Sequence, residues 1–204
     1  MAQSHDKTFV SYNQLHRLIR RTFEKNELVQ RFSPTLIVAI SAGGFLPARI
    51  LRHLIKSKTG QKSLSIQTIG LSLYENDDRQ ISKTQWISSD YRRDPLPICF
   101  SGENILIVDE VDETRTTLSY AVRELKNDIE RQRISFEHDQ KTWIEPKIGI
   151  FVVHNKNVPK QAELPDEIMK NFYFVGENVG SQWIVYPWDA LDIDEHTRLA
   201  ENSP

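Results

Sequence analysis

Residues 105–122, ILIVDEVDETRTTLSYAV, decide the fold class of this chain. The apolar run ILIV ends in four carboxylates within five positions, and the polar stretch TRTT follows at 114–117. Apolar residues then recur at helical spacing at Leu118, Ala121, Val122, Leu125 and Ile129. The pattern predicts a buried strand, a short turn and a helix. Its acidic cluster lies just past the carboxyl end of the strand, where open α/β sheets bind their ligands.

An upstream segment repeats this plan. TLIVAI at 35–40 predicts a strand and SAGG at 41–44 a tight turn. FLPARILRHLI at 45–55 predicts a helix, which tolerates Pro47 in its first turn because the missing N–H has no helical partner there. Residues 12–25 predict a further amphipathic helix from the spacing of their apolar positions.

Further apolar runs predict the rest of a sheet: LSIQTIGLSLY at 64–74, KIGIFVV at 147–153, FYFV at 172–175 and WIVY at 183–186. Residues 75–98 are polar, charged and proline-bearing around Trp86 and Ile87, which indicates a long functional loop. Strands that alternate with helices favour an α/β fold, a twisted and mostly parallel sheet flanked by helices on both faces. We expect a single domain over residues 1–204.

Composition narrows the classes of partner. The 204 residues are 39% hydrophobic and 26% charged, which suits one globular domain. A net charge of −2 without a basic run argues against nucleic acid as a partner, and no apolar run is long enough to span a membrane. The single cysteine, Cys99, and a start without an apolar signal core favour the cytoplasm.

The acidic cluster itself indicates a kind of ligand. Crowded carboxylates repel one another and need a cation or hydrogen-bond donors, so hydroxyl groups or hydrated Mg²⁺ would suit Asp109, Glu110, Asp112 and Glu113. Free N–H groups at a helix N-terminus suit an anion instead, beside Thr114, Arg115, Thr116 and Thr117. A 5-phosphoribosyl group, with vicinal hydroxyls and a terminal phosphate, would satisfy both halves. The alternative is an ordinary charged, solvated loop.

Other enzyme classes lack their motifs. An apolar strand that ends in DE also resembles the Walker B strand of nucleoside triphosphatases, but the G-x-x-x-x-G-K-[ST] loop of those enzymes is absent. No G-x-G-x-x-G occurs, and GLSLY at 70–74 lacks the final glycine of a G-x-S-x-G elbow. No two histidines have the spacing of metal ligands on one helix. An ATPase is the third hypothesis, after the two given below.

ILIVDEVDETRTTL resembles the phosphoribosyl pyrophosphate signature of type I phosphoribosyltransferases, above all the fungal purine salvage enzymes for hypoxanthine, guanine or xanthine. The similarity extends over most of the chain, through IVAISAGGFLPARILR, GLSLYE, KTQW, IFVVHNK and WIVYPWDALDIDEHT. The resemblance implies the type I phosphoribosyltransferase fold with a small base-binding hood over about 156–204, a mobile flap loop over about 74–98, and a homodimer.

The resemblance also implies roles for the acidic stretch. Asp109 and Glu110 would bind the ribose 2- and 3-hydroxyls, and the loop from Asp112 to Thr117 would cradle the 5-phosphate. Glu113 would accept a proton near purine N7, although the usual pattern has aspartate there and glycine in place of Arg115; the fungal members share the arginine but keep the aspartate. Mg²⁺ is the implied cofactor, with Glu110 and, through water, Asp189 as candidate ligands.

Three further groups complete the implied site. Backbone N–H groups of Ala42, Gly43 and Gly44 would meet pyrophosphate, and Ser72 and Tyr74 would begin the flap. The base would be held by Lys156 at its 6-oxo group, by stacking on Trp183, and by the backbone of Ile184 and Val185. His154 is expected to be a structural residue, and Trp188 fits a core position.

The implied function is that of an enzyme that joins a 6-oxopurine to phosphoribosyl pyrophosphate. The alternative is a regulatory protein that binds phosphoribosyl pyrophosphate or a nucleotide, with catalysis weakened by Glu113 and by Ala42, where related enzymes often carry a cation. The sequence does not indicate which 6-oxopurine is preferred.

Overall fold

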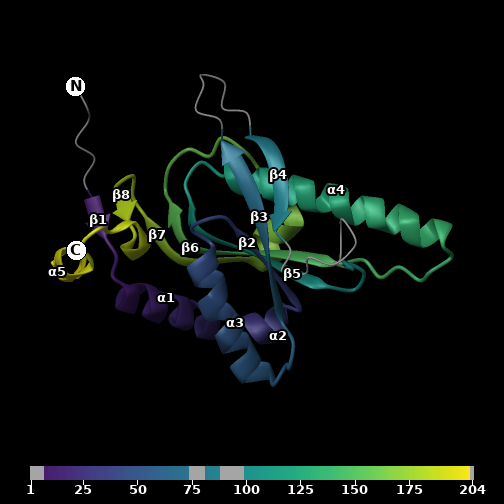
Figure 1. Cartoon of the computed structure of the whole chain (residues 1–204), viewed down its shortest axis with the longest axis horizontal. Coiled ribbons are helices and arrows are strands. Elements are labelled where there is room, and N and C mark those ends of the chain that lie inside the picture. Colours follow the sequence, from purple (N-terminus) through teal and green to yellow (C-terminus); the bar gives the residue numbers. More distant parts are fainter. Residues whose placement is uncertain (1–6, 74–80, 88–98, 203–204) are drawn as a thin grey trace.

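The computed structural model describes residues 7–73, 81–87 and 99–202, with the backbone alone for 71–73 and 81–87. Its centre is a six-stranded sheet in the order β4-β3-β2-β5-β6-β7 (Figure 1). The strands are β2 Leu36–Ile40, β3 Ser65–Leu73, β4 Ile81–Ile87, β5 Asn104–Asp112, β6 Lys147–Lys156 and β7 Tyr173–Val179. All pair in parallel except β4, which runs antiparallel to β3 at the edge. The predicted fold class is confirmed.

Helices cover both faces of this sheet (Figure 1). The first face carries α1 Tyr12–Lys25, α2 Leu28–Arg31 and α3 Phe45–Thr59, and the other carries α4 Thr116–His138. Side chains of a strand point alternately to the two faces, so Leu106 and Val108 pack with α1 and α3, whereas Ile105 and Ile107 pack with α4. This burial on both faces explains why ILIV is apolar at every position.

The order of the strands indicates where the ligand-binding site lies. From β2 the sheet continues to β3 on one side and to β5 on the other, so the order of the strands reverses between β2 and β5. Ligands of open α/β sheets bind in the crevice at the carboxyl ends of the strands beside such a reversal. The SAGG turn at 41–44 follows β2, and the acidic turn follows β5. Both predicted ligand-binding turns therefore meet at one crevice.

A small hood, formed by β1 Lys7–Phe9, β8 Trp183–Val185 and α5 Ile193–Glu201, lies beside the sheet (Figure 1). In it, β1 pairs in parallel with β8, and α5 packs against β1. A 3-10 turn, Pro187–Asp189, joins β8 to α5, and a π-helical turn, Ile168–Phe172, precedes β7. The sequence patterns predicted β8 but neither β1 nor α5. With three residues, β1 is too short to show a periodicity.

The prediction of a long loop at 75–98 is wrong in its middle, because β4 lies there. An antiparallel edge strand needs only one buried face, so ISKTQWI carries polar residues and shows little apolar character beyond Trp86 and Ile87. Residues 74–80 and 88–98, most of the expected flap, lie outside the described residues. Among the helices of the described residues, none is both long and apolar enough to cross a membrane.

Candidate active site

The crevice contains a cavity of about 280 Å³ at the carboxyl ends of β2 and β5. Eleven residues line it: Ile40, Ser41, Asp109, Glu110, Val111, Asp112, Glu113, Thr114, Arg115, Thr117 and Leu118. The structure thus brings together every predicted phosphoribosyl-binding residue except Thr116, whose hydroxyl lies 3.1 Å from that of Thr114. The carboxylates and the N-terminus of α4 therefore line the same cavity. Binding of a 5-phosphoribosyl group requires this arrangement.

Asp109 and Glu110 form a pair of carboxylates for which the described residues provide no cationic partner. Asp109 is buried, and this burial, followed by the neighbouring Glu110 carboxyl group and by Asp112, raises the pKa of Asp109 well above its ordinary value. The Glu110 N–H donates to Asp109 Oδ1 at 3.0 Å and partly offsets that rise. Glu110 Oε2 is buried and accepts no hydrogen bond from the described residues. Ribose hydroxyls or a Mg²⁺ ion fit such an oxygen.

Mg²⁺ would have few protein ligands here. Within residues 7–73, 81–87 and 99–202, no group of three or more His, Cys, Asp or Glu side chains could hold a metal ion. Mg²⁺ is commonly held by one or two carboxylates together with substrate phosphates, and the Asp109–Glu110 pair fits that donor set. Asp189 is exposed on the 3-10 turn. The pKa of Tyr186 is raised chiefly by burial, and the negative charges of Glu110, Asp109 and Asp189 raise it further.

The SAGG turn packs directly on the carboxylate pair. A Cβ atom on Gly43 would overlap the Glu110 carboxyl group, and one on Gly44 would overlap the Val108 carbonyl oxygen. Residue 44 must therefore be glycine for the turn to approach β5, because the clash there is with backbone, whereas a Cβ atom at residue 43 would force the end of the Glu110 side chain aside. The Ser41–Ala42 peptide bond is cis. Gly44 differs from the prediction, because its N–H donates to the Ile40 carbonyl at 3.0 Å and belongs to the start of α3.

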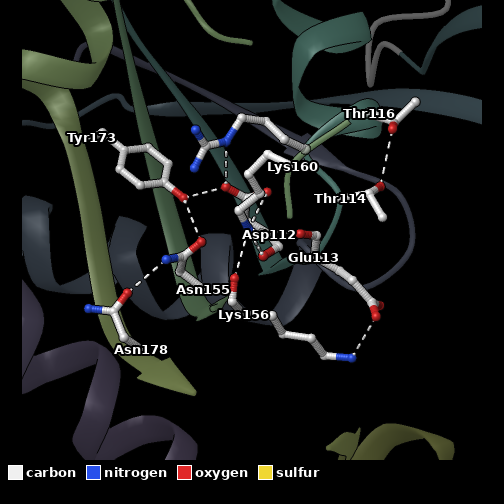
Figure 2. Close-up of polar contacts among 10 residues, drawn as sticks. Asp112, Glu113, Thr114, Thr116, Asn155, Lys156, Lys160, Tyr173 and Asn178 are labelled. Carbon is white, nitrogen blue, oxygen red and sulfur yellow. Dashed lines mark hydrogen bonds and ion pairs between the residues drawn. The ribbon is translucent and has the colours of Figure 1, made fainter. Parts of the chain in front are cut away.

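Asp112 holds the phosphate-binding turn from inside. Its side chain is fully buried, and Oδ2 accepts hydrogen bonds from the Tyr173 hydroxyl and from Arg115 Nε at 3.0 Å (Figure 2). Its Oδ1 accepts no hydrogen bond within the described part of the chain but lies 3.4 Å from Lys160 Nζ, close enough for attraction between the charges. The Asp112 carboxylate is thus a structural anchor, so phosphate binding would fall to the backbone and hydroxyl groups of residues 113–117.

Arg115 occupies a backbone conformation that is rare for side-chain-bearing residues. Its φ is 68°, in the left-handed region, at the N-cap of α4. The usual type I phosphoribosyltransferase pattern has glycine there, which adopts this conformation without strain. Arg115 folds back instead, with its guanidinium bound to Asp112 and 5.4 Å from the centre of the Tyr173 ring. Its cation lines the cavity but is already paired.

The predicted base-binding residues meet at the end of β6. Lys156 is 4% exposed, and its Nζ lies 3.0 Å from Glu113 Oε1 (Figure 2) and 5.6 Å from the centre of the Trp183 ring. Trp183 is 55% exposed, as a stacking platform would be, whereas Trp188 is half-buried and stacks on Tyr186. An exposed aromatic ring, a buried cation and a carboxylate therefore lie close together, and Glu113 also lines the phosphoribosyl cavity; we call this group of three side chains the predicted base-binding slot.

The two backbone positions of the base site are largely engaged in the hood. The Ile184 side chain is buried in the core, and the Val185 carbonyl accepts a hydrogen bond from Val10 N–H at 3.1 Å. Ser72 lies in β3 at the predicted start of the flap, but its side chain is outside the described part of the chain, as is all of Tyr74. The structure therefore says nothing of the flap roles.

Tyr186 and His154 link the hood to the backbone of Glu110, and only His154 was singled out by the sequence. The Tyr186 hydroxyl donates to the Glu110 carbonyl at 3.0 Å, so it accepts from His154 Nδ1 at 2.8 Å, which must carry the ring hydrogen. Burial lowers the pKa of His154 to about 4 and raises the pKa of Tyr186. The neutral His154 is structural, as predicted. Neither Tyr186 nor Tyr173 carried any local signal of its role.

Known proteins are similar to this chain in sequence and in fold, although no family model matches the chain. The hypoxanthine-guanine phosphoribosyltransferase of Schizosaccharomyces pombe is 44% identical over 201 residues, covering 93% of this chain and 92% of that protein. Xanthine phosphoribosyltransferase 1 of Saccharomyces cerevisiae is 42% identical over 207 residues, covering 96% of each.

Solved structures agree. A hypothetical protein from Neisseria gonorrhoeae with bound ppGpp superposes with a TM-score of 0.71 at 32% identity, covering 98% of each chain. A purine phosphoribosyltransferase from Pyrococcus horikoshii shares the fold with a TM-score of 0.58 at 20% identity, covering 92% of this chain and 96% of that chain. With its acidic signature at the reversal of the sheet and relatives over nearly its whole length, the chain belongs to the family of fungal hypoxanthine-guanine and xanthine phosphoribosyltransferases.

Proposed function

We propose that the chain transfers the 5-phosphoribosyl group of phosphoribosyl pyrophosphate to a 6-oxopurine, hypoxanthine, guanine or xanthine. The products are the nucleoside 5′-monophosphate and pyrophosphate. One observation carries this proposal: Lys156, Glu113 and Trp183 lie together, and Glu113 also lines a cavity that holds a carboxylate pair and a helix N-terminus. A ligand with a base, two ring hydroxyls and a phosphate matches this order of groups.

The side chains suggest how the reaction proceeds. Purine N9 forms a bond to ribose C1 as the bond from C1 to the pyrophosphate oxygen breaks, through a state with positive charge on the sugar. The carboxylates of Asp109 and Glu110 bind the ribose hydroxyls and favour that charge. Lys156 donates to the 6-oxo group, and Glu113 accepts the proton that the purine loses. When bound, Mg²⁺ offsets the negative charge of the departing pyrophosphate.

The assembly and location extend the proposal. Phe45 and Leu46 are exposed at the start of α3, directly after the SAGG turn, and this apolar pair supports a homodimer. Sedimentation of wild-type protein and of a Phe45→Ser variant would test the dimer, which the variant should weaken. The exposed free thiol of Cys99 supports the cytoplasm, where thiols stay reduced.

Offering hypoxanthine, guanine, xanthine and adenine separately, with phosphoribosyl pyrophosphate and Mg²⁺, tests the function. We expect turnover of at least one 6-oxopurine and none of adenine, because the Lys156 ammonium can only donate a hydrogen bond and the 6-amino group of adenine is itself a donor. Turnover of adenine alone would contradict the assignment of Lys156 to the base.

A regulatory protein is the second candidate. It is favoured by the Neisseria gonorrhoeae structure with bound ppGpp, which is 32% identical to this chain over 98% of its length. In that case the chain would bind phosphoribosyl pyrophosphate or a nucleotide without turning over any of the four bases. Calorimetric titration with these ligands, in parallel with the activity assay, separates the two candidates.

A further inference from the structure

Lys160 lies where the phosphate-binding turn and the base-binding slot meet. Its ammonium group points back from the loop after β6 into the turn between β5 and α4 (Figure 2). Nζ donates to the carbonyl oxygens of Asp112 at 2.8 Å, Glu113 at 2.7 Å and Lys156 at 3.0 Å. An ammonium group has three hydrogens, so these bonds use its whole donor capacity. A solvated surface lysine would show no such set of contacts.

The neighbouring residue adds a fourth link. The Gln161 N–H donates to the Thr114 carbonyl at 2.9 Å, so residues 160–161 bind three consecutive carbonyl groups of the turn at 112–114. The Lys156 side chain also meets Glu113 at 3.0 Å. The loop 156–161 and the turn 112–114 are therefore cross-linked into one unit, and the Lys160 side chain bonds to backbone carbonyl groups of both.

Charge also favours this position. Lys160 is 19% exposed, and burial lowers the pKa of its ammonium group, whereas the attraction of Asp112, whose Oδ1 lies 3.4 Å away, opposes that change. Asp112 has two other partners, Arg115 and Tyr173. A variant without the Lys160 ammonium would therefore not leave a buried carboxylate alone, and we expect it to fold.

We propose that Lys160 is a positioning residue that fixes the distance between the phosphate-binding turn and Lys156, and so sets the fit of every ligand that spans both. This inference rests on the proposed function, which puts the 5-phosphate at the turn and the 6-oxo group at Lys156. A nucleoside 5′-monophosphate spans both places. Phosphoribosyl pyrophosphate has no base, so it reaches the phosphate-binding turn, the carboxylates and the SAGG turn but not Lys156. Loss of Lys160 should therefore weaken the nucleotide selectively.

Calorimetry with inosine 5′-monophosphate and with phosphoribosyl pyrophosphate, both with Mg²⁺, tests this selectivity in wild-type protein, Lys160→Met and Lys170→Met. Lys170 is the matched control, because it is an exposed lysine paired only with Asp166 at 2.6 Å. A hydrogen bond to a charged group is worth roughly ten- to a hundredfold in affinity, and a misplaced Lys156 would lose that bond to the base. Lys160→Met should therefore lose roughly ten- to a hundredfold for the nucleotide and less than about threefold for phosphoribosyl pyrophosphate, and Lys170→Met should lose neither.

Two results would overturn the proposal. Equal losses for both ligands would place the effect of Lys160 in the phosphate site alone, and unchanged binding of both would make its bonds purely structural. Lys160→Gln, with two N–H donors on a shorter side chain, should show the same selectivity and serves if Lys160→Met does not fold. Wild-type protein that binds neither ligand would instead contradict the proposed function, so the two failures are distinguishable.

Discussion

Glu113 Oε1 lies 3.0 Å from Lys156 Nζ, so the expected proton acceptor and the expected ligand of the 6-oxo group form an ion pair. The pair joins the turn after β5 to the end of β6. Glu113 is 46% exposed and Lys156 only 4%, so the carboxylate can move into the slot while the lysine stays fixed. The two groups are thus held where a purine would meet both.

Glu113→Gln keeps the shape of the side chain but removes its ability to take up a proton. Because a positioned base contributes roughly a hundredfold or more, we expect kcat to fall by about that factor, with the KM for phosphoribosyl pyrophosphate changed by less than about threefold. Steady-state kinetics measure both. Turnover equal to wild type would remove Glu113 from proton transfer.

Glu113→Asp restores the residue of the family pattern and shortens the side chain by one methylene. We expect turnover within about tenfold of wild type, because the carboxylate remains beside the slot. A larger rise would mean that the glutamate site has relaxed from its catalytic geometry, which would favour the regulatory candidate.

Lys156→Ala should abolish the use of 6-oxopurines while phosphoribosyl pyrophosphate still binds. The change removes the one buried cation of the base slot but touches neither Asp109 nor Glu110, and Glu113 is exposed enough to be solvated alone. Lys147→Ala, at the exposed start of the same strand, is the control and should behave as wild type. Loss of phosphoribosyl pyrophosphate binding in Lys156→Ala would show that the two half-sites are not separate.

Gly43→Ala should raise the KM for phosphoribosyl pyrophosphate at least tenfold, because the new methyl group would overlap the Glu110 carboxyl group and displace it. Gly180→Ala is the matched control, since its methyl group would meet only the flexible end of the Gln182 side chain. Unchanged kinetics in Gly43→Ala would show that Glu110 can move without loss of ribose binding.

Arg115 allows a test of the left-handed backbone at the start of α4. Arg115→Gly and Arg115→Ala both lose the ion pair with Asp112, but only alanine retains the steric cost of a positive φ. We expect the glycine variant to be more stable than the alanine variant by about 1 kcal/mol in urea denaturation. Equal stability would mean that the turn changes conformation once the arginine is gone.

Because His154 is buried and neutral, we expect the folded protein to become less stable in acid. The pKa of histidine is about 6.5 in an unfolded chain, and burial lowers that of His154 to about 4. Between pH 4 and pH 6.5 the unfolded state binds one more proton at this residue than the native state does. The stabilisation that comes from the neutral His154 is therefore complete above pH 6.5 and is lost as the pH falls. Linkage gives a loss of about 2 kcal/mol between pH 7 and pH 5.

The control for this effect is His154→Gln. The raised pKa of Asp109 acts in the opposite direction, because the native state then holds the proton and stability falls as the pH rises. Both proteins contain Asp109, so its contribution cancels in the difference. Urea denaturation at pH 5 and pH 7 should show a smaller loss in the variant, and an equal loss would assign the acid sensitivity to other groups.

Much of the fold is predictable from the sequence because its periodic segments are long. The structure begins and ends α1 at the predicted residues, and the apolar stripe of α4 is buried throughout. The ILIV strand and the turn after it also lie where the pattern places them. By contrast, β1 and β4 depend on partner strands distant in sequence, and their own residues are too few or too polar to indicate pairing.

The site was predictable as a set of ligand-facing groups but not as a network. Lys160 stands in the polar stretch NKNVPKQ, where a lysine is typically solvated, and its bonds reach residues 47 and 48 positions away. The Tyr186 hydroxyl reaches a carbonyl 76 positions away. The sequence likewise counted Asp112 among the ligand-binding carboxylates, because nothing in its local pattern reveals that the side chain turns inward.

The most direct test of the central claim is to follow phosphoribosyl pyrophosphate, Mg²⁺ and hypoxanthine by phosphorus NMR, with wild-type protein and with the Asp109→Asn/Glu110→Gln double variant. The account predicts that wild-type protein forms nucleotide and pyrophosphate in equal amounts and that the double variant is at least a hundredfold slower, since its site has lost the carboxylate pair. No nucleotide from the wild type, or equal rates in both proteins, would contradict it.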